Sequence, residues 1–313
     1  MHKNELLVTV GVASYNNAAY VGETLDSIAA QTYKNIELIV VDDCSTDDSV
    51  RVITDWLAAN PNVDARLIQH QPNKGVSAVY NRILAEAKGE YLSIVGSDDV
   101  YLPEKTSHQL AELAPLSQDY AVICSDMYVI DKNGLEEPMT HLKSLDAGFN
   151  PFEGQIFESL LIQNRVCAPS IMMVTKAVRD IGGYDESLSF EDWDMWLRLS
   201  RKYSIKFSNF ISVKYRVLST SAWNSRGVRF YESSIRTLVK HLGISKEYDS
   251  IILTHIINYA ELIYILGDYR AAKWLNFAFL KMPTFRTGLL TTMATLRIPY
   301  IYYDKLYRLK KNS

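Results

Sequence analysis

The sequence predicts an α/β fold, a mostly parallel sheet flanked by helices, followed by an α-helical C-terminal region. Over residues 5–125, short apolar runs alternate with stretches whose apolar residues recur every three or four positions. Beyond about residue 226, almost every stretch has helical periodicity. Two aspartate pairs, Asp42-Asp43 and Asp98-Asp99, each follow an apolar run. Ligands of open α/β sheets bind at the carboxyl ends of the strands, so these pairs indicate the place of a site.

Five short apolar runs are predicted strands, over residues 6–13, 36–41, 65–69, 91–95 and 120–124. Apolar residues at helical spacing predict helices between them, over residues 21–28, 50–57 and 76–87. Ser45 or Thr46 is expected to cap the second helix, and Pro103 is expected in the first turn of a fourth. The alternation of strand and helix predicts a parallel sheet covered by helices.

The pattern changes after the fifth strand. Glycines and prolines punctuate residues 126–165, which predicts loops that wall or cover a site. An apolar run over residues 171–174 leads into a helix that ends before Gly182, and a second helical pattern runs from Glu191 to Tyr203. Four further helices are predicted over residues 229–242, 247–266, 268–281 and 285–309. We expect one α/β domain over residues 1–225 and a helical region over residues 226–313.

The composition is that of an ordinary globular protein, with 48% hydrophobic and 22% charged residues among 313. A formal net charge of -3 argues against nucleic acid as a partner. The three cysteines are too widely spaced for a zinc motif, which favours a reducing compartment. Neither a signal peptide nor a transmembrane run of about 18 apolar residues is recognisable. We therefore expect a cytoplasmic protein.

The two aspartate pairs are predicted to share one end of the sheet. Four carboxylates gathered there would repel one another unless a cation or hydrogen-bond donors compensated them. Ala13, Ser14 and Asn16 follow the first strand at the same end. With Asp42-Asp43, such strand-end groups can hold a planar base and a ribose. The polar residues after the first pair could instead only cap a helix, which leaves the pair itself unexplained.

The second pair belongs to the cluster Gly96-Ser97-Asp98-Asp99. A carboxylate in a strand-end loop can bind Mg²⁺ or Mn²⁺ with one or two protein ligands, because a diphosphate and water complete the shell. Asp98 and Asp99 are therefore candidate metal ligands, and Ser97 is a candidate nucleotide contact. The alternative is an ordinary turn rich in Gly, Ser and Asp.

Lys74 and Gly75 precede the third predicted helix. A lysine and a helix N-terminus together attract phosphate, so both residues are candidate nucleotide contacts. Gly75 could equally be a turn residue, and a mixed role is the favoured interpretation.

Glu191, Asp192 and Asp194 open an aromatic-rich helix. Acids at a helix N-terminus interact favourably with its dipole, so one or two of them could be structural. A carboxylate here could also be the general base that deprotonates an acceptor hydroxyl. Trp193 and Trp196 could form a platform for a sugar ring, but their helical spacing favours core packing for at least one.

Together these motifs resemble the inverting glycosyltransferases of family 2, which have the Rossmann-like GT-A fold. The match spans about residues 5–220 and rests on six stretches in a fixed order: residues 10–16 (VGVASYN), 40–47 (VVDDCSTD), 73–81 (NKGVSAVYN), 89–103 (GEYLSIVGSDDVYLP), 182–185 (GGYD) and 191–198 (EDWDMWLR). The resemblance implies a nucleotide-sugar-binding half, residues 1–103, and an acceptor half, residues 104–225.

The resemblance also implies roles for the donor side. Asp43, together with Asp42, would contact the nucleobase, with Ala13 and Ser14 beside it. Asp98 corresponds to the metal-binding Asp of the family's Asp-x-Asp motif. The implied cofactor is a divalent metal, Mn²⁺ or Mg²⁺, and UDP is the expected carrier.

On the acceptor side, Asp192 corresponds to the catalytic base, with Glu191 as the reserve candidate and Trp193 beside them. The implied reaction is a single displacement that inverts the anomeric centre. The implied acceptor is a hydroxyl of a glycan or a lipid-linked saccharide in cell-surface polysaccharide biosynthesis.

The sequence departs from the family pattern at two places. Gly96 replaces the first Asp of Asp-x-Asp, so the metal is expected to rest chiefly on Asp98, the diphosphate and water. Leu218 stands where many relatives have a His two positions after a Tyr-Arg pair. Arg216, Ser219 or Ser221 is then expected to contact the diphosphate in its place.

Two other functions stay open from the sequence alone. A nucleotidyltransferase would carry a Gly-rich loop with Lys or Arg directly after the first strand, and residues 13–17 (ASYNN) do not match one. A nucleotide-sugar-binding module without catalysis is kept open by Gly96.

The C-terminal region raises a separate question. Residues 251–266 and 289–309 are rich in Ile, Leu and Tyr, and the chain ends in Arg308, Lys310 and Lys311. Helices that pack on the catalytic domain or form a homodimer would have this composition, and this is the favoured interpretation. The alternative is peripheral contact with the cytoplasmic face of the inner membrane.

Overall fold

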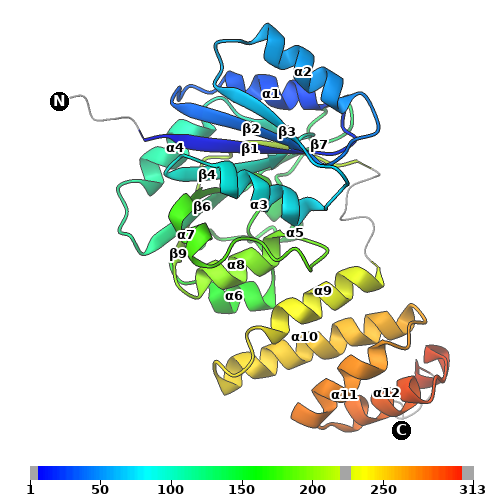
Figure 1. The fold of residues 1–313 in the computed structure, drawn as a ribbon. Helices are drawn as coiled ribbons and strands as arrows, with labels where there is room; N and C mark the ends of the chain where they lie inside the picture. Colours follow the sequence, from blue (N-terminus) through cyan, green and yellow to red (C-terminus); the bar gives the residue numbers. More distant parts are fainter. Residues whose placement is uncertain (1–5, 219–226, 305–313) are drawn as a thin grey trace. The chain divides into compact units, whose positions relative to one another are not determined.

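The computed structural model describes residues 6–218 and 227–304 (Figure 1). The chain divides into two compact units. The α/β unit comprises residues 1–186 and 191–219, and the helical unit comprises residues 187–190 and 220–313. The predicted fold class is confirmed, because a helix-flanked α/β sheet is followed by a helical region. The predicted boundary at residue 225 lies outside the described residues.

A seven-stranded sheet forms the centre of the α/β unit, in the order β3-β2-β1-β4-β8-β6-β9. Strands β3, β2, β1 and β4 are parallel to one another, and β6 is parallel to β9. Strand β8 runs antiparallel to both β4 and β6. All five predicted strands are present, and their bounds agree with the predictions to within two residues. The strands are β1 Val8–Ser14, β2 Ile36–Asp42, β3 Ala65–Gln69, β4 Tyr91–Gly96, β6 Tyr120–Ser125, β8 Met172–Val174 and β9 Ser204–Ser208.

The central strands are apolar on both faces because helices cover both sides of the sheet. Val10 and Val40 are fully buried, and Ile94 is 1% exposed. Figure 1 shows α1 (Val21–Ala29) and α2 (Ser49–Ala59) on one side of the sheet and α3 (Val76–Glu86) on the other. Gly11 permits the close approach of α3 to β1, since a Cβ there would lie 2.4 Å from Cγ2 of Ile83.

Two predicted helix starts are wrong. Helix α2 begins at Ser49 rather than after Ser45 or Thr46, and no side chain caps it. The carboxylate of Asp47 accepts the Ser49 N–H (2.9 Å) in a turn of its own before the helix, which delays the helix start. Helix α4 begins at Lys105 and runs to Leu113, so Pro103 precedes the helix instead of standing in its first turn.

A second, three-stranded sheet has the order β5-β10-β7. It combines β5 (Val100–Tyr101) and β10 (Val213–Arg216) with β7 (Tyr128–Ile130), which lies in the segment predicted as loops. The same segment carries the short helices α5 (His141–Leu145) and α6 (Phe157–Ile162). Strands of two to four residues show no readable alternation, so the sequence pattern could not predict this sheet.

The rest of the α/β unit carries Glu191 and Asp192, which together are called the second acid cluster below. After β8 follow α7 (Thr175–Asp180) and α8 (Asp192–Ser200), and a short 3₁₀ turn (Ala168–Ser170) precedes β8. The helical pattern predicted from Glu191 therefore begins one residue later and ends at Ser200.

The helical unit includes α9 (Val228–Val239), α10 (Lys246–Ile265), α11 (Ala271–Lys281) and α12 (Phe285–Thr295), and consecutive helices among these pack on one another (Figure 1). The predicted helix over residues 285–309 is too long. Helix α12 ends at Thr295, and Arg297 has a φ of 56°, which an α-helix does not allow. Within residues 6–218 and 227–304, no helix combines the length and the apolar composition needed to cross a bilayer.

Candidate functional site

The ends of β1, β2 and β4 lie next to one another and bring the candidate donor residues together. Ser14 pairs with Asp42 on one side of β1, and Ala13 pairs with Gly96 on the other. The backbone N–H of Ser97 donates to the carbonyl of Ala13 (3.0 Å). The predicted convergence of the strand-end loops is therefore present in the fold.

Asp42 ties the loop after β2 to the loop after β1. Its Oδ2 accepts the hydroxyls of Ser45 (2.5 Å) and Ser14 (3.1 Å), and its Oδ1 accepts the Ser45 N–H (2.9 Å). Asn16, with a φ of 52°, donates its N–H to Ser45 Oγ (2.9 Å) and accepts the Thr46 N–H (2.8 Å). These bonds already occupy much of the hydrogen-bonding capacity that a nucleobase could use.

Asp43 holds the segment that leads into α3. Its Oδ1 lies 2.8 Å from Nδ1 of His70 and accepts the Lys74 N–H (2.9 Å), while Oδ2 accepts the Gly75 N–H (2.7 Å). The carboxylate is buried, with 3% of Asp43 exposed. A carboxylate offers about four acceptor sites, so one remains for a ligand. The residue motifs did not indicate this positioning role.

The start of α3 combines an exposed lysine with an unsatisfied hydroxyl. Lys74 is exposed, and Gly75 adopts a φ of 89° where the helix begins. Ser77 is 3% exposed, and its Oγ has no hydrogen-bond partner among the described residues. A buried hydroxyl without a partner is costly, so a ligand oxygen at this helix end would satisfy it.

The turn after β4 concentrates negative charge. Asp99 is 3% exposed. Its burial, and to a lesser degree the neighbouring charge of Asp98, raise its pKa well above the usual range. Burial also raises the pKa of Asp98, whose carboxylate makes no hydrogen bond to another described residue. A Cβ on Gly96 would lie 2.8 Å from Asp98 Oδ1 and 3.4 Å from Asp99 Oδ2. Both carboxylates therefore border the space over Gly96.

This donor set fits a divalent cation. Mg²⁺ and Mn²⁺ prefer carboxylate oxygens, and a cation would relieve the repulsion between the two buried acids. Among the described residues, no group of three or more His, Cys, Asp or Glu side chains forms a complete cage. Asp98 and Asp99 would thus share the ion with oxygen ligands from elsewhere, such as a diphosphate and water.

Arg216 lies beneath this turn rather than in open solvent. The residue is 2% exposed, and its Nε donates to the carbonyl of Asp98 (2.9 Å). Its Nη1 donates to the carbonyl of Asp131 (3.1 Å), and its Nη2 pairs with Glu23 (2.6 Å). Its backbone N–H donates to Asp99 Oδ1 (2.9 Å). A diphosphate contact would require Arg216 to leave these partners, so we assign it to holding the turn.

We expect Arg216→Met to lower the free energy of unfolding by about 3 kcal/mol, because buried acceptors lose a charged partner. Urea unfolding followed by circular dichroism measures this. Glu23→Gln is the control and should cost less than about 1 kcal/mol, because the Glu23 side chain is 54% exposed. A stable Arg216→Met variant with weakened nucleotide binding would restore the predicted diphosphate contact. Ser219 and Ser221, the other candidates for that contact, lie outside the described residues.

The second acid cluster sits at the N-terminus of α8. Burial and then the charge of Asp192 raise the pKa of Glu191 far above its usual value. Burial also raises the pKa of Asp192, while hydrogen bonds from the Trp193 N–H (2.6 Å) and from Asn164 lower it. The hydrogen bonds from Trp193 and Asn164 stabilise the charged form of Asp192, whereas the hydrogen bond that lowers the pKa of Glu191 comes from its own backbone, so Asp192 ionises first. At neutral pH, Asp192 is therefore the better base of the two.

Asn164 orients the Asp192 carboxylate and was not singled out from the sequence. Its Nδ2 donates to Asp192 Oδ2 (2.9 Å), and its Oδ1 accepts the Val166 N–H (3.2 Å). The bond to Val166 fixes which end of the amide faces Asp192. Asn164 lies 28 residues before Asp192, just after α6, and no local motif links the two.

We expect Asn164→Ala to shift the acid limb of the activity profile to higher pH. The lost hydrogen bond stabilises the charged form of Asp192, so its loss raises the pKa of that carboxyl further and leaves less of the base ionised. At pH values below the pKa of this carboxyl, the variant should be roughly tenfold slower than the wild type, and its rate should recover at high pH. Gln163→Ala, an exposed neighbour, is the control. A uniform loss at every pH would indicate a structural role only.

Two tyrosines connect the acid clusters. Burial raises the pKa of Tyr215, and the charges of Asp99, Asp98, Glu191 and Asp192 raise it further. Burial raises the pKa of Tyr80 too, and its phenol also responds to acids of both clusters. Both acid clusters are thus near the same two phenols. The fold therefore brings the strand-end acids and the α8 acids into one region.

The two tryptophans of α8 pack in the core. Trp193 is 8% exposed and donates its Nε1–H to the carbonyl of Leu160 (2.8 Å). Trp196 is 1% exposed. A sugar platform needs an accessible ring face, so core packing, the alternative that the spacing favoured, describes both residues. The predicted acceptor-side role of Trp193 is therefore not supported by its burial.

Comparison with known proteins identifies the family. Residues 9–181 match the model for Glycosyl transferase family 2. An uncharacterized glycosyltransferase of Rickettsia bellii is 30% identical over 261 residues, which cover 81% of this chain and 37% of the relative. WfaP of Escherichia coli, a UDP-Glc:alpha-D-GlcNAc-diphosphoundecaprenol beta-1,3-glucosyltransferase, is 27% identical and covers 79% of this chain and 91% of the relative. The matches span 34% to 66% of the length of the first five curated relatives.

Two solved structures share the fold. S. aureus TarS 1-349, in complex with UDP, has a TM-score of 0.66 and 19% identity, and the match covers 97% of this chain and 92% of that one. The mannosyltransferase PcManGT from Pyrobaculum calidifontis, in complex with GDP-Man and Mn²⁺, has a TM-score of 0.61 and 18% identity, with 95% and 83% covered. At this identity they establish the GT-A-type fold alone. The family match covers more than half of the sequence, so the chain belongs to glycosyltransferase family 2.

Proposed function

We propose that this chain transfers a sugar from a nucleotide sugar, with UDP as the expected carrier, to a hydroxyl of a glycan or lipid-linked saccharide. The observation that carries the proposal is the approach of two acid clusters, Asp98-Asp99 and Glu191-Asp192, to the same two phenols. One cluster suits a metal-bound diphosphate, and the other suits a general base. The UDP in the TarS structure and the UDP-Glc named for WfaP support the choice of carrier.

The donor would lie along the strand ends. The loops that Asp42, Asp43 and Asn16 hold together would receive the base and ribose, with backbone groups of Ala13 and Ser14 close by. The start of α3 would receive phosphate, because Lys74 is exposed and the Ser77 hydroxyl lacks a partner among the described residues.

The acceptor hydroxyl would lose its proton to Asp192 as its oxygen attacks the anomeric carbon. The bond from that carbon to the diphosphate oxygen breaks in the same step, so the anomeric centre inverts. Asn164 holds the accepting carboxylate in place, and Glu191 retains its own proton at neutral pH. A divalent cation at Asp98 and Asp99 would supply positive charge against the growing charge of the leaving diphosphate. The Mn²⁺ in the PcManGT structure supports this choice of cofactor.

The proposed class of acceptor follows from similarity to a relative. WfaP is named for a lipid-linked diphosphate acceptor, which supports an acceptor of that class and a role in cell-surface polysaccharide biosynthesis. Homodimer formation through the helical unit and a cytoplasmic location stay predictions.

A thermal-shift screen of UDP-, GDP- and dTDP-sugars with Mn²⁺ or Mg²⁺ tests the proposal. We expect stabilisation by one nucleotide class only when metal is present, followed by transfer to saccharide acceptors with that donor. Stabilisation by nucleoside triphosphates together with sugar phosphates would favour a nucleotidyltransferase. Donor binding without any transfer or hydrolysis would favour a binding module.

A further inference from the structure

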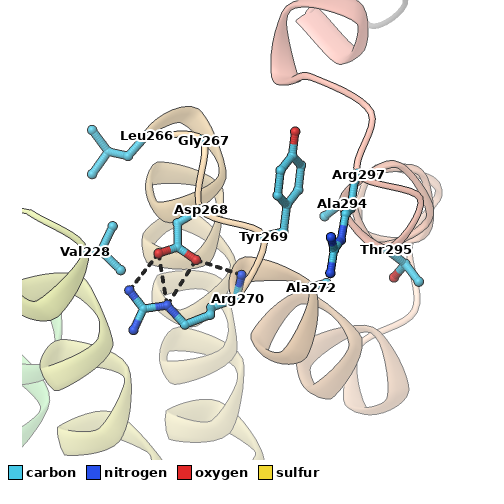
Figure 2. Close-up of a pocket in the computed structure, with 10 residues that line it drawn as sticks. All are labelled: Val228, Leu266, Gly267, Asp268, Tyr269, Arg270, Ala272, Ala294, Thr295 and Arg297. Carbon is cyan, nitrogen blue, oxygen red and sulfur yellow. Dashed lines mark hydrogen bonds and ion pairs between the residues drawn. The ribbon is translucent and has the colours of Figure 1, made fainter.

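An apolar rim lies at one end of the helical unit. A cavity of about 740 Å³ is lined by the α10–α11 connection and the end of α12 (Figure 2). A second cavity of about 450 Å³ shares Gly267 and Tyr269 with it. We define the apolar rim by the large apolar side chains in and beside these cavities, which are 49% to 66% exposed: Ile265, Leu266, Leu296, Ile301 and Tyr302.

The cavities beside the apolar rim are also lined by charged side chains. In Figure 2, Arg270 pairs with Asp268 (2.6 Å), and it also pairs with Glu232 (3.3 Å), so its charge is compensated. Arg297 lines the first cavity, is exposed, and forms no ion pair with another described residue. Asp304 lines the second cavity. An exposed cation among exposed aliphatic side chains is typical of surfaces that bind at a lipid interface.

The charge of the whole chain is divided unequally between its parts. Residues 220–313 carry 14 Lys and Arg against six Asp and Glu, a formal net charge of +8. Residues 1–219 carry 19 against 30, a formal net charge of -11. The overall charge of -3 conceals this difference. The helical unit is therefore complementary to an anionic partner.

We propose that the apolar rim binds the surface of an anionic lipid bilayer. Stable binding at such a surface needs two contributions, burial of apolar side chains and attraction of basic residues, and the helical unit supplies both. Its helices do not need to cross the membrane for this. The proposal does not depend on which sugar the α/β unit transfers.

A second copy of the chain fits the rim less well. A symmetric dimer through the rim would place the same surface of both copies face to face, and so would bring two units of +8 together. Nucleic acid would satisfy the charge but would leave the aliphatic side chains of the rim exposed to water. A bilayer with anionic headgroups satisfies both features at once.

Flotation of the full chain with vesicles tests the proposal. We expect binding to vesicles that contain phosphatidylglycerol, weaker binding to pure phosphatidylcholine, and weakening by salt. Leu266→Ser combined with Leu296→Ser should lower the partition coefficient at least about tenfold. Arg297→Glu should weaken binding to the anionic vesicles only.

The matched control is Leu280→Ser combined with Phe285→Ser. These side chains are 75% and 62% exposed but lie at the α11–α12 connection, away from the rim. This variant should bind vesicles like the wild type, and circular dichroism should show both double variants folded. No binding by the wild type, or equal loss in both double variants, would overturn the proposal. A dimer in light scattering that only the rim variant abolishes would assign the rim to a second copy.

Discussion

Asp192→Asn is expected to lower the rate of sugar transfer by about 10³-fold while donor affinity stays within threefold of the wild type. Asparagine keeps the shape and one of the two acceptor oxygens that the Trp193 N–H and Asn164 use, but it cannot accept a proton at neutral pH. The base acts on the acceptor, so the strand-end loops that would bind the donor are unaffected. Steady-state transfer rates and calorimetric titration of the donor measure the two quantities separately.

Glu191→Gln is the matched control for that result. Glu191 retains its proton at neutral pH because burial and the charge of Asp192 raise its pKa, and glutamine resembles the protonated acid. We expect this variant to keep most of its activity. If Glu191→Gln loses transfer and Asp192→Asn keeps it, the two residues have exchanged roles, and Glu191 is the base.

Asp98→Ala is expected to weaken metal-dependent donor binding by about 10²-fold or more, since even the loss of an outer partner of a metal ligand costs 10- to 100-fold. Its carboxylate borders the space over Gly96 and has no hydrogen-bond partner of its own among the described residues. The remaining donor affinity should not respond to EDTA. Titration of the nucleotide sugar with Mn²⁺ and with EDTA measures both effects.

Asp48→Ala controls for the loss of one negative charge, because its side chain is 68% exposed and pairs only with Arg51 among the described residues. It should bind donor and metal normally. Wild-type affinity that is the same with Mn²⁺ and with EDTA would rule out the metal at Asp98. Gly96 leaves the ion with fewer protein ligands, so we expect weak metal binding in the absence of nucleotide.

The central sheet was predictable because its strands are long and buried on both faces. Runs such as residues 36–41 are apolar enough to be recognised alone, and the five predicted strands all appear. The small sheet of β5, β10 and β7 was not predictable, because each strand is short and pairs with residues far away in sequence. The predicted start of α2 was wrong because the Asp47 side chain binds the local backbone before the helix.

The acidic residues of the candidate site were predictable, because they stand directly after strands or at the start of a helix. The residues that position those acids were not, because their contacts span long sequence separations. Arg216 reaches Asp98 across 118 residues, and Asn164 reaches Asp192 across 28. The burial of Trp193 also depends on packing against α6, which no local pattern of α8 encodes.

The products formed from a nucleotide sugar distinguish sugar transfer from nucleotidyl transfer and from binding alone. The protein is incubated with Mg²⁺, the donor found by thermal shift and a saccharide acceptor, and the phosphorus products are identified by ³¹P NMR after quenching with EDTA. We expect release of nucleoside diphosphate by the wild type, and little release by Asp192→Asn or Asp98→Ala. Formation of nucleoside triphosphate and sugar phosphate on addition of pyrophosphate, or equal release by all three proteins, would contradict it.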